Sequence, residues 1–86
     1  MDIYAHALET LRERGYRLTR PRQVVLEILL KSHEHLDAET LYDLAKVKDS
    51  NISLATIYRS LALLKETGFV QEHRLGESHG HFETTS

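Results

Sequence analysis

Hydrophobic residues recur at helical spacing along the first two-thirds of the chain, and turn or capping residues bound each stretch. Residues 2–14 predict a first helix, which carries Tyr4, Leu8 and Leu11 on one face and ends at Gly15. A second helix begins near residues 19–21, because threonine can cap a helix and proline suits its first turn. Its residues 24–30 are apolar almost all round, which predicts the central buried helix.

Two more helices and a hairpin complete the predicted order. Asp37 is expected to cap a third helix over residues 37–47, and Ser53 a fourth over residues 53–67 that Gly68 ends. Residues 69–75 and 81–84 predict two short strands around a turn, and such a hairpin must pack on the helices to be stable. The buried face of the third helix is predicted at Ala38, Leu41, Tyr42 and Ala45, and that of the fourth at Leu54, Ile57, Leu61 and Leu64.

This order predicts a fold that is mainly α with a small β-hairpin. The third and fourth helices, joined by a short turn, form a helix-turn-helix, and the hairpin that follows is the wing of a winged helix. With 86 residues the chain has room for one core, so residues 1–86 are expected to form one winged-helix domain.

Composition excludes several classes of protein. The chain has no cysteine, which excludes disulfides, thiolate zinc sites and a cysteine nucleophile. It has no run of 18 apolar residues and no basic-then-apolar start, so we expect no membrane segment and no signal peptide, and a cytoplasmic location.

Charge is unevenly distributed. The net charge of −2 argues against a uniformly basic nucleic-acid binder, but five arginines stand against one acidic residue between positions 12 and 22. This surplus fits a solvated helix end as well as a surface that contacts nucleic acid. The arginines are Arg12, Arg14, Arg17, Arg20 and Arg22.

The outward face of the fourth helix has the residues that a base-reading helix needs. Arg59 lies at the middle of this face, Ala55 and Thr56 lie near it, and Tyr58 is on its flank. In a major groove arginine can bond guanine bidentately, and an apolar edge can contact a thymine methyl. Taken alone, the same face also fits an ordinary amphipathic surface helix.

Histidines gather near the end of the chain. His79, His81 and Glu83 alternate, so in a strand they would share one face. Imidazole and carboxylate groups suit zinc, iron, nickel or manganese, and the spacing does not choose among these metals. A solvated turn without a ligand is the alternative.

Several motifs together resemble the ferric uptake regulator family over nearly the whole chain. They are Gly-Tyr-Arg-Leu-Thr-Arg-Pro-Arg (15–22), His-Leu-Asp-Ala-Glu-Thr-Leu-Tyr (35–42), Ile-Ser-Leu-Ala-Thr-Ile-Tyr-Arg-Ser-Leu (52–61), Gly-Phe-Val (68–70) and His-Phe-Glu (81–83). The resemblance implies a metal-responsive transcriptional regulator, a repressor that binds double-stranded DNA and is not an enzyme.

The resemblance also implies roles for single residues in DNA binding. Tyr58 and Arg59 match residues that read bases in the major groove, and Arg17 matches a basic residue inserted into an A·T-rich minor groove. Arg22, Ser53 and Thr56 would be backbone-positioning contacts, and Arg20 and Ala55 are further DNA-binding candidates.

For the metal, the resemblance points first to His35 and Glu83, which match ligands contributed by the DNA-binding half of family members. His79 and His81 match histidines found in some members, and His33 and His73 are weaker candidates. The implied cofactor of the full-length protein is iron, zinc, manganese or nickel, and we expect a weak or incomplete site in this chain.

Family members continue into a histidine-rich hinge and an α/β dimerisation domain, whereas this chain stops at Ser86. We therefore expect an isolated DNA-binding domain that is monomeric alone, and a full-length homodimer that closes on a palindromic, A·T-rich operator.

Two other hypotheses fit the same residues. A winged-helix module that binds protein would use Tyr58 and Arg59 as anchors on a partner surface. A small metallohydrolase would use His79, His81 and Glu83, but no nucleophile and base accompany them and so short a chain offers little pocket to exclude water.

Overall fold

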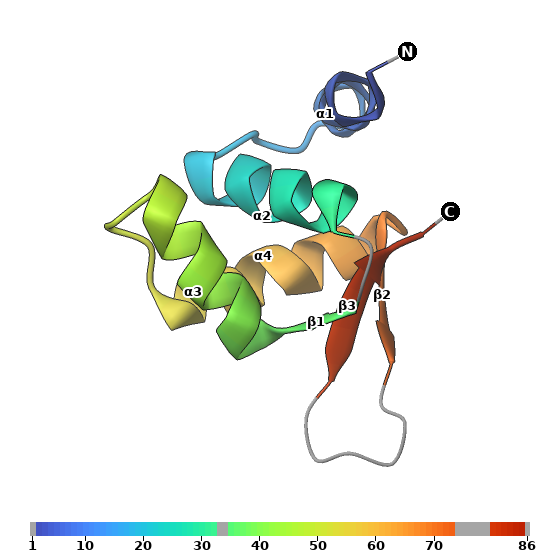
Figure 1. Cartoon of the computed structure of the whole chain (residues 1–86). Coiled ribbons are helices and arrows are strands. Elements are labelled where there is room, and N and C mark those ends of the chain that lie inside the picture. The colour runs from blue at the N-terminus through green and yellow to red at the C-terminus, as the bar shows by residue number, and fades with distance from the viewer. Residues whose placement is uncertain (1, 33–34, 74–79, 86) are drawn as a thin grey trace.

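The computed structural model describes residues 2–32, 35–73 and 80–85, which form four helices and three strands (Figure 1). Along the chain these are α1 (Ile3–Glu13), α2 (Arg20–Lys31), β1 (Leu36–Asp37), α3 (Ala38–Lys48), α4 (Leu54–Glu66), β2 (Val70–His73) and β3 (His81–Thr84). The winged helix-turn-helix expected from the sequence is confirmed. None of the helices in these ranges is long and apolar enough to cross a bilayer.

Each helix starts at a side chain that accepts a hydrogen bond from the backbone of the first turn. The Asp37 carboxylate accepts from the Thr40 N–H at 2.8 Å, and the Ser53 hydroxyl accepts from the Thr56 N–H at 3.1 Å. Such caps satisfy N–H groups that have no partner inside the helix. Asp2 and Thr19 do the same for α1 and α2.

Helix α2 is the centre of the core, as its apolar sequence predicted. It packs against α1, α3, α4 and β3. In Figure 1 it lies between α1 on one side and the α3–α4 pair on the other. The predicted buried stripe of α4 is confirmed at Ile57, Leu61 and Leu64, while Leu54 is half-buried. Burying each of these large side chains stabilises the fold by about 1.5–3 kcal/mol.

The hairpin is part of a sheet with one more strand than the sequence predicted. The sheet is antiparallel with the order β1-β3-β2, so β3 is its central strand. Strand β1 pairs Leu36 with Phe82 and Asp37 with His81, directly before α3 begins. Two residues are too few to show an alternating pattern, which is why this strand was not predicted.

The two faces of the sheet differ in character. Val70 and Phe82 are buried, and Leu36 packs against the same core. Because side chains alternate along a strand, His81 and Glu83 lie on the opposite face of β3 from Phe82. Strand register places His73 beside His81 on this second face. The core face thus fixes the sheet to the helices and leaves the other face for polar groups.

Candidate nucleic-acid interface and metal centre

The outward face of α4 presents the side chains that the sequence singled out. The Tyr58 side chain is 52% exposed, and Ala55 and Arg59 are exposed as well. The opposite face of the helix is buried against α2, α3 and β2. Helix α4 therefore presents these three side chains from a rigid support.

A chain of side-chain hydrogen bonds crosses the first turn of α4. The Arg59 Nη2 donates to Thr56 Oγ1 at 3.1 Å, and Thr56 Oγ1 lies 2.9 Å from Ser53 Oγ. Ser53 Oγ also caps the helix by accepting the Thr56 N–H. The guanidinium of Arg59 is thereby held toward the start of α4.

Two arginines in the first turn of α2 donate to backbone carbonyls. Arg22 Nη1 donates to the Arg17 carbonyl at 2.7 Å, and Arg20 Nη2 donates to the Lys48 carbonyl at 3.3 Å. The Lys48 carbonyl belongs to the last residue of α3, where helix carbonyls have no partner inside the helix. Arg20 and Arg22 therefore have structural partners, which the charge count alone did not indicate.

Arg17 lies between α1 and α2, in the segment that Arg22 braces. Its side chain is exposed, and it makes no hydrogen bond or ion pair with any residue of 2–32, 35–73 and 80–85. The backbone of Arg17 is thus fixed while its guanidinium projects into solvent. This combination suits a cation that must reach an external anion.

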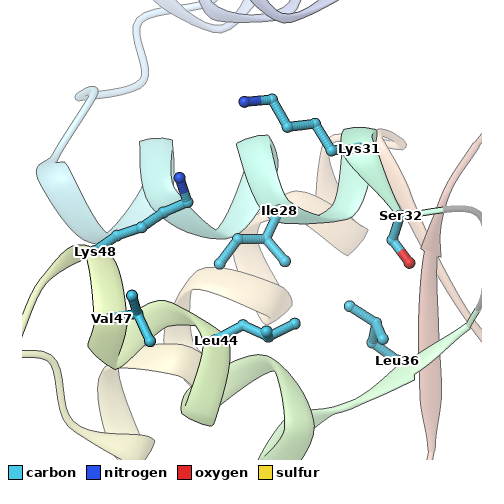
Figure 2. Close-up of a pocket in the computed structure, with 7 residues that line it drawn as sticks. All are labelled: Ile28, Lys31, Ser32, Leu36, Leu44, Val47 and Lys48. Carbon is cyan, nitrogen blue, oxygen red and sulfur yellow. The ribbon is translucent and has the colours of Figure 1, made fainter.

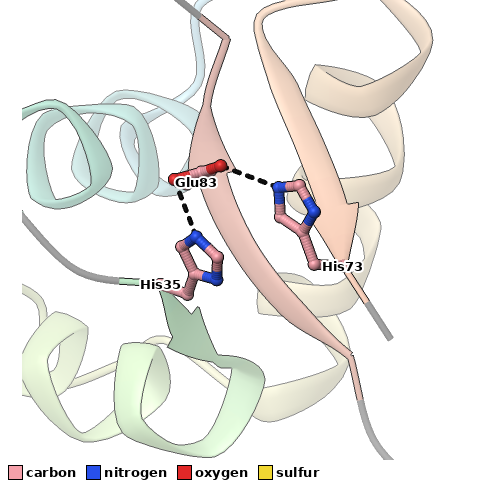
Figure 3. A group of neighbouring side chains, drawn as sticks. All are labelled: His35, His73 and Glu83. Atoms are coloured by element: carbon pink, nitrogen blue, oxygen red, sulfur yellow. Dashed lines mark hydrogen bonds and ion pairs between the residues drawn. The ribbon is translucent and has the colours of Figure 1, made fainter. Parts of the chain in front are cut away.

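Three side chains converge on the polar face of the sheet (Figure 3). Glu83 Oε2 lies 3.0 Å from His35 Nε2, and Glu83 Oε1 lies 2.7 Å from His73 Nε2. One ligand atom from each residue lies within 4.8 Å of the others. His35 directly precedes β1, His73 ends β2, and Glu83 is on the central strand, so strand pairing brings the group together.

The donor set of this metal centre fits a divalent transition metal. Two imidazole nitrogens and one carboxylate oxygen are the ligand types that zinc, iron and manganese accept. The side chains of His35, His73 and Glu83 are 37%, 29% and 35% exposed, so further ligands can approach from solvent.

His35 and Glu83, the two residues to which the resemblance points first, lie close together, and His73, a weaker candidate, is their third partner. His81 lies opposite His73 on β3 but is not part of the close group found within the described ranges. His33 and His79 lie outside the described residues. The register of β2 against β3 places His73 on the polar face of the sheet, and this register identifies His73 as a member of the group.

An apolar groove lies between α2 and α3 (Figure 2). Its volume is about 440 Å³. Leu44 and Val47 on its α3 wall are 44% and 87% exposed. The lining residues are Ile28, Lys31, Ser32, Leu36, Leu44, Val47 and Lys48.

An ion-pair cluster joins α2 to α3 beside this groove. The Glu27 carboxylate accepts from Lys48 Nζ at 3.0 Å and from Lys31 Nζ at 3.1 Å. These hydrogen bonds, the one from Lys48 first, hold the pKa of Glu27 below its usual range. The ion pair from Lys48 to Glu27 connects α3 to α2.

Tyr4 on α1 lies near the same carboxylate. Burial, and then the negative charge of Glu27, raises the pKa of Tyr4.

Comparison with known proteins matches most of the chain. The family model of the "Ferric uptake regulator family" matches residues 13–86. The chain is 38% identical over 78 residues to the ferric uptake regulation protein of Brucella abortus biovar 1 (strain 9-941). This match covers 91% of the chain and 55% of that relative, so the chain spans about half the length of the curated protein.

Solved structures share the fold. PerR from Streptococcus pyogenes, described for peroxide sensing and gene regulation, has a TM-score of 0.90 at 32% identity, covering 98% of this chain and 58% of that one. The ferric uptake regulator from Pseudomonas aeruginosa with manganese has a TM-score of 0.80 at 30% identity, covering 91% and 59%.

Proposed function

The chain belongs to the ferric uptake regulator family, and from this premise we propose that it is the DNA-binding part of a metal-responsive transcriptional repressor. The observation that carries the proposal is the outward face of α4, which presents Tyr58 and a held Arg59 opposite a fully packed face. A helix of this kind in a winged helix enters the major groove of DNA.

In this proposal α4 reads bases in the major groove. Arg59 bonds a guanine edge, and Tyr58 supplies an aromatic edge for a thymine methyl. Ala55 allows the helix to approach closely, because its side chain is short.

Cations and hydroxyls around α4 position the domain on the DNA backbone. Ser53 and Thr56 are near phosphates at the start of α4, and Arg20 and Arg22 are near phosphates at the start of α2. Arg17 enters the adjacent minor groove, where A·T-rich sequence narrows the groove and concentrates negative potential.

The metal centre links DNA binding to metal supply. His35, His73 and Glu83 would hold a divalent transition metal, which would cross-link the residue before β1 to strands β2 and β3. His81 is a neighbouring candidate ligand, and His33 and His79 are candidates from the sequence. Three protein ligands leave the coordination open, so further ligands in the full-length protein would complete it.

The remaining features of the proposal concern the whole protein. Relatives extend well beyond the length matched here, and the full-length protein is proposed to be a homodimer that closes on a palindromic, A·T-rich operator. Residues 1–86 would be one winged-helix domain of that protein, monomeric alone. The proposed role is regulatory and not enzymatic, and it places the protein in the cytoplasm with the DNA that it binds.

Salt dependence of duplex binding tests the proposal. Fluorescence anisotropy would follow the chain on a labelled A·T-rich duplex between 50 and 200 mM salt, conditions in which released counterions lower affinity steeply (roughly 10³-fold or more for about six phosphate contacts). The double variant Tyr58→Ala, Arg59→Ala is expected to lose sequence preference while it retains most of this salt slope. A parent chain with no duplex binding would contradict the proposal and favour the protein-binding module.

A further inference from the structure

Among the described residues, the Thr56 hydroxyl makes side-chain hydrogen bonds with Arg59 and Ser53 alone. It accepts from Arg59 Nη2 at 3.1 Å and lies 2.9 Å from Ser53 Oγ. Positions three apart on a helix are neighbours on one face, so this contact costs no distortion of α4. The side chain between the cap and the base-reading arginine is therefore a candidate for holding that arginine.

We infer that Thr56 is a positioning residue, which sets the direction of the Arg59 guanidinium before DNA arrives. This inference rests on the proposed function and goes beyond it. There Thr56 was proposed to lie near a phosphate, whereas here it acts on DNA recognition through Arg59. Arginine loses several rotatable bonds of freedom when it binds a base, and a side chain that is already held loses less.

The hydrogen-bond donors of Arg59, Thr56 and Ser53 are sufficient for this role. A guanidinium has five N–H groups, so one bond to Thr56 leaves the other donors available for a base edge. Either hydroxyl can donate in the contact between Ser53 and Thr56, and in both arrangements one hydroxyl proton remains. That proton can be donated to a phosphate oxygen of the DNA. The position of α4 on the DNA backbone would then be coupled to the direction of the Arg59 guanidinium.

Hydroxyl chemistry makes the inference testable with small changes. Thr56→Val removes the hydroxyl and keeps the shape, and the cap bond from the backbone N–H of residue 56 to Ser53 Oγ remains. Thr56→Ser keeps the hydroxyl. Thr10→Val is the matched control, since Thr10 is a helical threonine on α1 whose hydroxyl donates to the His6 carbonyl.

The first measurement is made without DNA. NMR relaxation of the Arg59 side-chain nitrogen Nε reports how ordered the guanidinium is. We expect a lower order parameter in Thr56→Val than in the parent, and the parent value in Thr56→Ser and in Thr10→Val. An unchanged value in Thr56→Val would overturn the inference.

The second measurement uses a duplex enriched by the parent chain from a random pool and a scrambled duplex of equal composition. We expect Thr56→Val to lower the ratio of the two affinities by about two- to tenfold, the range that one hydrogen bond supports. In an Arg59→Ala background the same change should have no further effect on the ratio. A further loss of the ratio in that background would show that Thr56 reads a base itself, independently of Arg59, which overturns the inference.

The two arms separate this inference from the proposed function. If no duplex is enriched, the proposed function fails while the relaxation data still decide whether Thr56 holds Arg59. If enrichment succeeds and Thr56→Val keeps the parent ratio, the proposed function stands and the positioning role is wrong. Circular dichroism of each variant checks that α4 is intact.

Discussion

His35 and His73 stack face to face, with ring centroids 4.7 Å apart and ring planes 12° from parallel. The strands that carry or adjoin them each pair with β3 and not with one another, so the stack spans the central strand. Glu83 on β3 gives one carboxylate oxygen to each ring (Figure 3). The carboxylate thus links two histidines that are far apart in the sequence.

Removing His73 tests whether this group binds metal. We expect the parent chain to bind zinc weakly, because three protein ligands leave the site open. His73→Ala should lower the zinc affinity at least about tenfold, since even the loss of a residue that only hydrogen-bonds a ligand costs about 10- to 100-fold. Isothermal titration with zinc measures both. Protons compete for imidazole nitrogens, so the affinity of the parent should also fall on acidification.

His6→Ala is the control, because His6 is an exposed histidine on α1 and outside the group. It should leave zinc binding unchanged. Equal affinities of the parent and His73→Ala would contradict the assignment of His73, and the double variant His35→Ala, Glu83→Ala would then show whether the other two residues bind metal without it.

Arg59→Ala is expected to abolish the preference for a selected duplex while weak nonspecific binding remains. A bidentate arginine–guanine contact carries about 1–3 kcal/mol of discrimination. Anisotropy titrations with selected and scrambled duplexes measure the ratio. Arg12→Ala removes the same charge from an exposed position on α1 and should leave that ratio unaltered. An unaltered ratio in Arg59→Ala would remove its base-reading role.

Helix boundaries were predictable because their signals are local. Asp37 and Ser53 act as caps through their own side chains, and Gly68 follows α4 at a φ of +86°, a conformation that glycine adopts without strain. Strand β1 gave no such signal, since its two residues are defined by pairing with β3 and not by their own pattern.

Periodicity predicted site residues only where one element holds them, whereas His35 and Glu83, which no single element holds, came from the family resemblance. Arg59 and Tyr58 follow from the helical period of α4 alone. His73 joins His35 and Glu83 through strand register, which depends on tertiary pairing. Likewise, the charge count could not indicate that Arg20 and Arg22 donate to carbonyls, because those partners come from the folded backbone.

Glu27→Gln should destabilise the fold slightly at neutral pH and less in acid. The two lysines hold the pKa of Glu27 below its ordinary value of 4.5, so its contribution is present above that value and is lost as pH falls through the lowered pKa. Thermal melts from pH 7 to pH 3 should therefore show the parent and variant converging. Glu9→Gln, an exposed change on α1, is the control. A Tm difference that persists in acid would assign the effect to packing.

Arg17→Ala is expected to weaken binding most on duplexes with A·T-rich flanks. The motivation is the braced segment: Arg22 holds the Arg17 carbonyl at 2.7 Å while the Arg17 side chain is exposed. A narrow A·T minor groove has enhanced negative potential, so a guanidinium gains more there than beside a G·C-rich flank. Anisotropy titrations on one selected duplex with either flank would compare the losses.

Arg22 supplies the matched comparison for this prediction. Arg22→Ala removes the brace but keeps the Arg17 charge, so it should reduce the same flank preference to a smaller degree than Arg17→Ala. A lost phosphate contact alone would instead lower affinity equally on both flanks and reduce the salt slope by about one. Equal losses on the two flanks in Arg17→Ala would thus make Arg17 a phosphate contact, and an unaffected flank preference in Arg22→Ala would show that the Arg17 backbone needs no brace.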